Sequence, residues 1–178
     1  MLNLFPTNRY NGLPFIPLDE ELGLNISIMV LIISAFGKNT KETLILDINK
    51  LQIFLYLVKN PARIAEILKY AGKTYTGLDI KQTFTIKSLS SNVDILYDND
   101  KVKFLIKKLA ASGLLLASKT EDNSTKLYLS EIGLKFAEGL DAVYFLTVRE
   151  LIEVLAPLKS LPTSKLNSLL NKVFGGEQ

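Results

Sequence analysis

The stretch DNDKVKFLIKKLAASGLLLASKTEDNSTKLYLSEIGLKFAEG, residues 98–139, decides the fold. Apolar residues recur at helical spacing over 101–112, and Gly113 follows as a residue suited to end a helix. Two short strand-like runs then flank a polar turn, which predicts a β-hairpin, and Ser130 is placed to cap a short helix over 131–138. This order of elements predicts a mainly α-helical α+β fold. The predicted strands are 114–119 and 126–130.

The same stretch resembles the second half of a winged helix-turn-helix. In that family a helix that ends in a small residue, a glycine and two leucines leads directly into a hairpin called the wing, and residues 112–115 read SGLL here. The resemblance predicts a winged-helix-like unit with a short β-hairpin wing and additional N- and C-terminal helices. Winged helices serve DNA binding and protein assembly alike, so the resemblance leaves the function open.

Further helices are predicted on both sides of this unit. The first of them is apolar nearly all round, so we expect it to be the most buried helix, or one packed on both its own core and a neighbour. We expect an extended proline-rich arm over 1–22, a helical winged-helix-like domain over 23–140, and a C-terminal helical segment over 141–178 that packs on it. A strand is predicted over 83–87. The predicted helices outside the unit are 24–36, 48–59, 61–71, 142–158 and 164–174.

The N-terminal arm combines three prolines with large apolar side chains. Prolines at this density prevent a regular helix and favour extended backbone. An apolar extended arm either lies in a groove of its own domain or docks on a partner. We expect a group of apolar side chains to lie near a partner surface: Phe5, Phe15, Ile28, Ile32 and Phe104.

The chain contains neither cysteine nor histidine. It therefore lacks a thiol nucleophile, a disulfide, a thiolate or imidazole metal ligand, and an imidazole general base. We expect a protein that is not an enzyme and that has no cofactor, no metal ion and no small-molecule substrate. Hydrophobic residues make up 48% of the 178 residues and the mean hydropathy is +0.22, which indicates either a large core or apolar surface reserved for a protein partner. We favour the partner, because a small chain has little interior in which to bury such surface.

The N-terminus lacks the basic start of a secretory signal, and the most apolar run, 26–36, is about half as long as the ~20 residues of a membrane-spanning helix. We therefore expect a cytoplasmic protein without membrane contact. The formal net charge of +3 is too small to indicate nucleic-acid binding unless the lysines cluster.

Lysines do cluster on the helix predicted over 101–112 and beside the hairpin turn. The cluster has three interpretations: a solvated face of an amphipathic helix, weak sequence-independent contact with DNA phosphates, or sequence-specific readout. Readout is disfavoured because the outer face lacks Arg, Asn and Gln, and because Glu121 and Asp122 at the turn repel phosphate. The candidate DNA contacts are Lys101, Lys103, Lys107, Lys108, Lys119 and Lys126.

Three more stretches carry a narrower resemblance: LPFIP at 13–17, DEELGLN at 19–25, and LQIFLYLVKNP at 51–61. Together they resemble the middle components of bacterial ABC-three-component systems, the class that includes Lamassu-type anti-phage defence. The resemblance implies a non-enzymatic subunit that bridges an SMC/Rad50-like ABC ATPase and an effector in an anti-phage or anti-plasmid defence complex. The alternative, from the lysines and the winged-helix resemblance, is a stand-alone DNA-binding transcriptional regulator.

Overall fold

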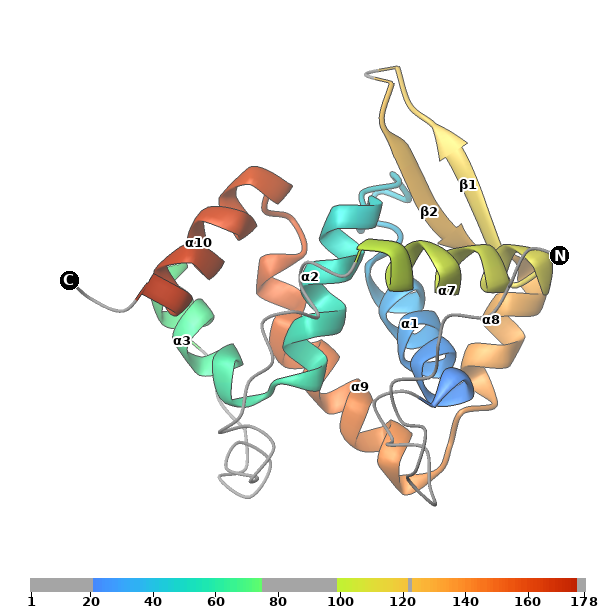
Figure 1. The fold of residues 1–178 in the computed structure, drawn as a ribbon, viewed down its shortest axis with the longest axis horizontal. Coiled ribbons are helices and arrows are strands. Elements are labelled where there is room, and N and C mark those ends of the chain that lie inside the picture. The colour runs from blue at the N-terminus through green and yellow to red at the C-terminus, as the bar shows by residue number, and fades with distance from the viewer. Residues whose placement is uncertain (1–20, 75–98, 122, 176–178) are drawn as a thin grey trace, which may run out of the picture.

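The computed structural model describes residues 21–74, 99–121 and 123–175. Within these ranges the chain forms seven α-helices, one 3-10 helix and a two-stranded antiparallel sheet (Figure 1). The predicted mainly α-helical class with a short hairpin is confirmed. Phe5, Phe15, nearly all of the predicted arm and the predicted strand over 83–87 lie outside the described residues.

Two helices, α1 (Leu22–Phe36) and α2 (Ile48–Lys59), occupy the centre of the molecule (Figure 1). The carboxylate of Glu21 caps α1 by accepting hydrogen bonds from the amides of Gly23 and Leu24. Helix α1 then packs against α2, three other helices and the hairpin, so all of its residues from 27 to 33 are buried. The helix therefore lies in the core, but it is not the most buried one: nine of its 15 residues are buried, against nine of the 12 residues of α2.

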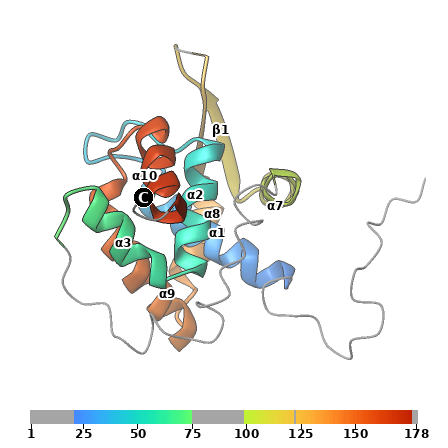
Figure 2. The same cartoon turned by 60° about the vertical axis from the view of Figure 1, so that its left-hand side comes forward.

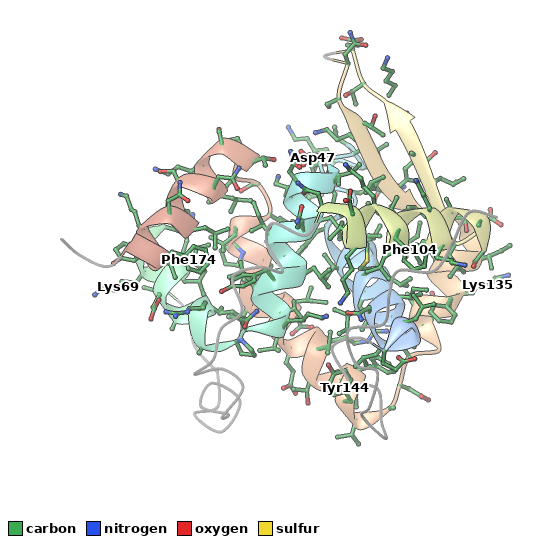
Figure 3. The ribbon with its side chains drawn as sticks, viewed as in Figure 1. Asp47, Lys69, Phe104, Lys135, Tyr144 and Phe174 are labelled. Carbon is green, nitrogen blue, oxygen red and sulfur yellow. The ribbon has the colours of Figure 1, made fainter. Side chains whose placement is uncertain are left out.

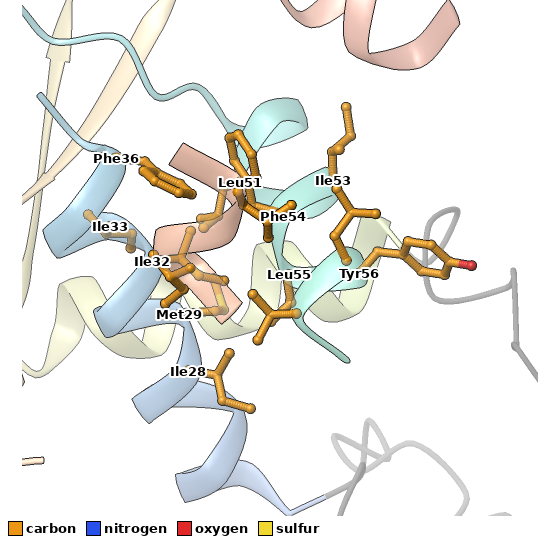
Figure 4. Packing of buried hydrophobic residues seen from close by; sticks show 14 of the residues in the cluster. Ile28, Met29, Ile32, Ile33, Phe36, Leu51, Ile53, Phe54, Leu55 and Tyr56 are labelled. Atoms are coloured by element: carbon orange, nitrogen blue, oxygen red, sulfur yellow. The ribbon is translucent and has the colours of Figure 1, made fainter. Parts of the chain in front are cut away.

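Helix α2 is buried on two opposite sides. On one side Phe54 packs on Phe36 of α1 with ring centroids 4.5 Å apart (Figure 4). On the other side Tyr56 points away from α1 and lies edge-on to Phe174, at 5.7 Å between centroids. Even the polar Lys50 and Gln52 are buried. The helix therefore links the core around α1 with the C-terminal layer.

The order of elements predicted from residues 98–139 is confirmed as α7 (Asn99–Ala111), β1 (Leu115–Lys119), β2 (Thr125–Leu129) and α8 (Glu131–Glu138). Each predicted strand is shifted or shortened by a residue, as is usual at element ends. The pairing runs from Leu115 opposite Leu129 to Lys119 opposite Thr125. Figure 2 shows the hairpin projecting beyond the helical body, with α7 beside its base.

Local sequence signals determine where α7 ends and where α8 begins, on either side of the hairpin. Gly113 ends α7 with a φ of +70°, a left-handed conformation that glycine adopts without steric cost. The Ser130 hydroxyl caps α8 by accepting from the Gly133 amide at 3.0 Å, and it donates to the Gly113 carbonyl at 2.6 Å. A Cβ on Gly133 would lie 2.2 Å from the Leu114 carbonyl oxygen, so only glycine lets α8 pack this closely on the start of β1.

The C-terminal part consists of α9 (Val143–Leu155), the 3-10 helix Ala156–Leu158 and α10 (Thr163–Gly175). The prediction of one helix over 142–158 is wrong, because Pro157 has no amide hydrogen to continue the α-helical bonding. Helix α9 packs on α1 and α2, whereas α10 packs on α2 and α3 (Ala62–Tyr70). No helix in the described ranges is both long and apolar enough to span a membrane.

Candidate functional site

Large apolar side chains that remain exposed lie mainly on the second half of the fold. Six of the nine found in the described residues belong to α8 and the first turn of α9. The other three lie at the start of α1, on α7 and on β1. The nine are Leu22, Phe104, Leu116, Ile132, Leu134, Phe136, Val143, Tyr144 and Leu146.

Helix α7 presents one exposed aromatic side chain among lysines, as the sequence predicts. Its inner face buries Val102, Leu105 and Leu109, which leaves the opposite face to solvent. Phe104 lies on that outer face and is 48% exposed (Figure 3). The Lys108 amine lies 5.5 Å from the centre of its ring, within the range of a cation–π contact. We call Phe104 with Lys103, Lys107 and Lys108 the α7 surface.

The candidate DNA-contacting lysines do not share one environment. Lys103, Lys107 and Lys108 are exposed on α7, and Lys119 is exposed at the end of β1, whereas Lys101 is half-buried. The Lys103 amine lies 3.9 Å from Asp100, an exposed pair that adds little stability. The structure therefore places four of the six amines where a phosphate could reach them.

Lys126 differs from the other candidates because its amine is held by a carboxylate inside the fold. It lies 3.4 Å from Asp47, and the two side chains are 17% and 24% exposed. The backbone amide of Leu127 donates to the Leu46 carbonyl at 2.8 Å, which fixes β2 beside the start of α2. The Lys126 side chain thus helps to anchor the hairpin, and its role as a DNA contact stays a prediction.

Asp47 is the centre of a polar junction that joins three elements of the fold. One carboxylate oxygen caps α2 by accepting from the Lys50 amide at 2.9 Å. The other oxygen accepts from the Thr163 hydroxyl at the start of α10, at 3.1 Å, and faces Lys126. We call Asp47, Lys50, Lys126 and Thr163 the Asp47 junction. Because it connects the hairpin, α2 and α10, it fixes the hairpin against the C-terminal layer.

The Lys50 side chain is buried within this junction. Its amine donates to the Lys159 carbonyl at 2.8 Å, at the end of the 3-10 helix. Burial lowers the pKa of Lys50, the Asp47 charge partly offsets this by raising it, and the nearby Lys126 charge lowers the pKa further. The sequence signals the cap but not this long-range network.

Two of the residues expected near a partner surface are instead in the core. Ile28 and Ile32 are 1% and 0% exposed because α1 is covered by α2, α7, α8, α9 and β2. The prediction that they lie near a partner is therefore corrected. Phe104 is the one residue of that group that the described chain leaves exposed.

The exposed apolar residues of α8 and α9 are a feature that the sequence analysis missed. On α8, Ile132 is 63% exposed, and on α9, Val143 is 81% exposed. Figure 3 shows Tyr144 at the end of α9 that projects away from the other helices. The signal in the sequence is the run VYFL at 143–146, which is apolar all round although the rest of the helix is amphipathic. We call Ile132, Leu134, Phe136, Val143, Tyr144 and Leu146 the α8–α9 surface.

The arrangement suits binding between macromolecules. In the described ranges no three Asp or Glu side chains come together in a way that could hold a metal ion. Exposed aromatic and aliphatic side chains are the residues that gain most from being covered by a partner. The α7 surface offers such a residue among positive charges, and the α8–α9 surface offers six.

Comparison with protein families found a match to the model of the ABC-three component (ABC-3C) system Middle Component 4, over residues 36–168. The match covers the whole span from the end of α1 to the middle of α10, including both surfaces and the Asp47 junction. Searches of curated proteins and of solved structures found no match.

Proposed function

We propose a function from one premise: the chain belongs to the Middle Component 4 family of ABC-three component systems. A middle component is one part of a multi-component defence system, so it works with protein partners. We propose that this chain is a non-enzymatic subunit that bridges an SMC/Rad50-like ABC ATPase and an effector. The complex would act in cytoplasmic defence against phages and plasmids.

The observation that carries the proposal is the presence of exposed apolar side chains at two separate places. Figure 3 shows Phe104 on α7 and Tyr144 at the far end of α9, well apart on the body of the molecule. A bridge needs two such places, because each partner must be held without displacing the other. Stable protein interfaces cover about 800 Å² on each partner and are centred on a few aromatic or aliphatic anchors.

The rigidity of the body supports the same role. The Asp47 junction connects the hairpin, α2 and α10, and the Arg149 guanidinium donates to the Ala137 carbonyl at 2.6 Å, which ties α9 to the end of α8. A connecting subunit can hold its two partners in a defined relative position only if its own binding surfaces are fixed relative to each other. Catalysis by this chain would have to proceed without any histidine or cysteine.

The alternative, a DNA-binding regulator with a winged-helix-like unit, draws its support from the exposed lysines of α7. The ion pair with Asp47 makes Lys126 less available to phosphate, and the exposed Glu121 beside the hairpin turn would face phosphate with a negative charge. We therefore retain bridging as the proposed function, and the experiment below separates the two.

The test is co-expression of the tagged chain with the ATPase and effector subunits encoded beside it, followed by affinity purification. Phe104→Asp should release one of the two subunits, and Val143→Asp should release the other. Ser168→Asp, which adds the same charge at an exposed position of α10, is the matched control and should retain both. All three variants change exposed side chains, so each should melt within a few degrees of wild type.

Two results would contradict the proposal. The wild-type chain could be recovered alone, as a clean dimer that binds DNA in a salt-sensitive way, which would support the regulator. Alternatively, both subunits could be retained by both surface variants, which would show that neither surface contributes to assembly.

A further inference from the structure

Helix α9 carries a regular stripe on its solvent-exposed side. Val143, Leu146, Glu150 and Glu153 follow each other at intervals of three, four and three residues. At about 100° per residue this spacing keeps the four side chains on one face of the helix. All four are exposed. The same spacing defines the contact line between two helices that pack side by side.

The stripe lies opposite the side by which α9 is attached to the protein. The attached side buries Val148, Leu151, Ile152 and Leu155 against α1 and α2. These residues point about 180° away from the stripe when both are projected along the helix axis. The apolar half of the stripe is therefore not the edge of the core. Val143 and Leu146, 81% and 48% exposed, form a second apolar contact line that the described chain leaves open.

The charge around the stripe is negative. Between residues 141 and 153 the acidic residues are Asp141, Glu150 and Glu153, and the one basic residue is Arg149. The guanidinium of Arg149 donates to the Ala137 carbonyl on α8, so this charge is directed toward the body. A segment that packs along the stripe meets aliphatic side chains in the first turn of α9 and the exposed Glu153 carboxylate two turns later.

We propose that this face of α9 docks an amphipathic helix of a partner subunit. The helix carries aliphatic residues opposite Val143 and Leu146, and Lys or Arg opposite Glu153. This inference rests on the proposed bridging function and assigns one of its two contacts. The apolar pair supplies most of the affinity, and the charges set the direction in which the partner helix lies.

A second copy of this chain is a weaker candidate for the occupant. Its α7 surface is basic, but it offers a single large apolar residue, Phe104. A contact between α7 of one copy and α9 of the next joins different surfaces, and such contacts close only into rings or else extend into filaments. The experiment therefore includes this outcome.

The chain has no cysteine, so a single introduced thiol gives a unique attachment point. Leu146→Cys is labelled with a thiol-reactive photo-crosslinker and purified with the co-expressed ATPase and effector subunits. Ser168→Cys on α10 is the matched control. Mass spectrometry then identifies the peptide attached to residue 146. We expect a segment of another subunit with aliphatic residues three and four apart and with Lys or Arg one or two turns away.

Two affinity measurements complete the test. Leu146→Asp should weaken partner binding by about 30-fold or more, as expected for the loss of an interface anchor. Glu153→Lys should weaken it by about 2- to 5-fold at low salt, and less at high salt.

The failure of this inference is distinguishable from failure of the bridging function. If both subunits copurify but residue 146 is attached to no subunit, or to another copy of this chain, the α9 assignment is overturned and bridging stands. If the wild-type chain retains neither subunit, bridging fails, and the docking site fails with it.

Discussion

Replacing Asp47 by alanine should destabilise the protein more than its position near the surface suggests. The side chain is 24% exposed, yet its two oxygens connect segments that lie far apart in the sequence. Alanine removes the cap on α2 at the Lys50 amide, the acceptor for the Thr163 hydroxyl at 3.1 Å, and the partner of the Lys126 amine at 3.4 Å. The contribution of each of these interactions to the free energy of unfolding can be approximated from measured values for other proteins.

The loss of an N-cap costs about 1 kcal/mol. The hydrogen bond from a hydroxyl to a carboxylate contributes about 1.5 kcal/mol. The partly exposed ion pair contributes about 0.5 kcal/mol. The sum predicts that Asp47→Ala lowers the free energy of unfolding by about 3 kcal/mol, and the melting temperature by roughly 6–12 °C for a chain of this size.

The assay is urea denaturation of wild type and variants, followed by circular dichroism. Asp47→Asn is the informative control, because asparagine caps helices as well as aspartate does but carries no charge; it should lose about 1 kcal/mol less than alanine. A double-mutant cycle with Thr163→Val should give a coupling free energy of about 1 kcal/mol, because the two side chains share one hydrogen bond. A loss below about 0.5 kcal/mol for Asp47→Ala, which is typical of an ordinary surface change, would refute the junction.

Three other changes test separate parts of the structure. Gly133→Ala places a methyl group 2.2 Å from a carbonyl oxygen and should lower the free energy of unfolding, measured by urea denaturation, by about 2 kcal/mol or more. Gly175→Ala is the control, because its methyl group meets no atom within 4 Å, and it should be nearly neutral. Equal effects of the two changes would contradict the close packing of α8 on β1. Lys50→Met should remove a pH dependence of stability, because the pKa of Lys50 is lower in the folded than in the unfolded protein. Wild type should therefore gain stability relative to the variant as the pH rises from the folded pKa toward the usual value of about 10.4. A stability difference that stays flat or falls over this pH range would show that burial does not lower the pKa of this amine. The double change Lys107→Glu and Lys108→Glu should alter DNA retention at low salt by less than about 2-fold in fluorescence anisotropy, and a drop above about 10-fold would return the DNA-binding regulator to first place.

The sequence predicts those features that depend on neighbours along the chain. Gly113 and Ser130 mark the ends of α7 and the start of α8 because the conformational freedom of glycine and the capping hydroxyl act within a few residues. The polar turn between alternating strand residues likewise predicts the hairpin, to within one residue at its ends. These signals are local, so no knowledge of the tertiary structure is needed to use them.

Features that depend on distant contacts were predicted incompletely or not at all. Asp47 directly precedes the predicted helix over 48–59, where a cap is expected. Lys126 and Thr163, however, lie 79 and 116 residues further along the chain, and nothing in their local sequence pairs them with it. Ile28 and Ile32 were expected near a partner because α1 is apolar all round; five other elements cover that helix in the fold. The apolar pattern of a helix therefore does not indicate whether its surface is covered by the same chain or by another one.

The α8–α9 surface shows the converse case. The apolar first turn of α9 is visible in the sequence, but whether it lies in the core depends on where the core ends. In the fold the core ends at Val148, so the preceding turn projects beyond it with Val143 exposed. The tertiary structure is therefore needed to identify the α8–α9 surface, whereas the sequence alone already indicates the α7 surface.

Bridging requires that this chain connect two other subunits. The direct measurement is native mass spectrometry of the ATPase and effector subunits, expressed together with and without this chain. We expect one complex containing all three components in a fixed ratio, and separate ATPase and effector when the chain is omitted. An ATPase–effector complex that forms equally well without the chain would contradict the bridging role.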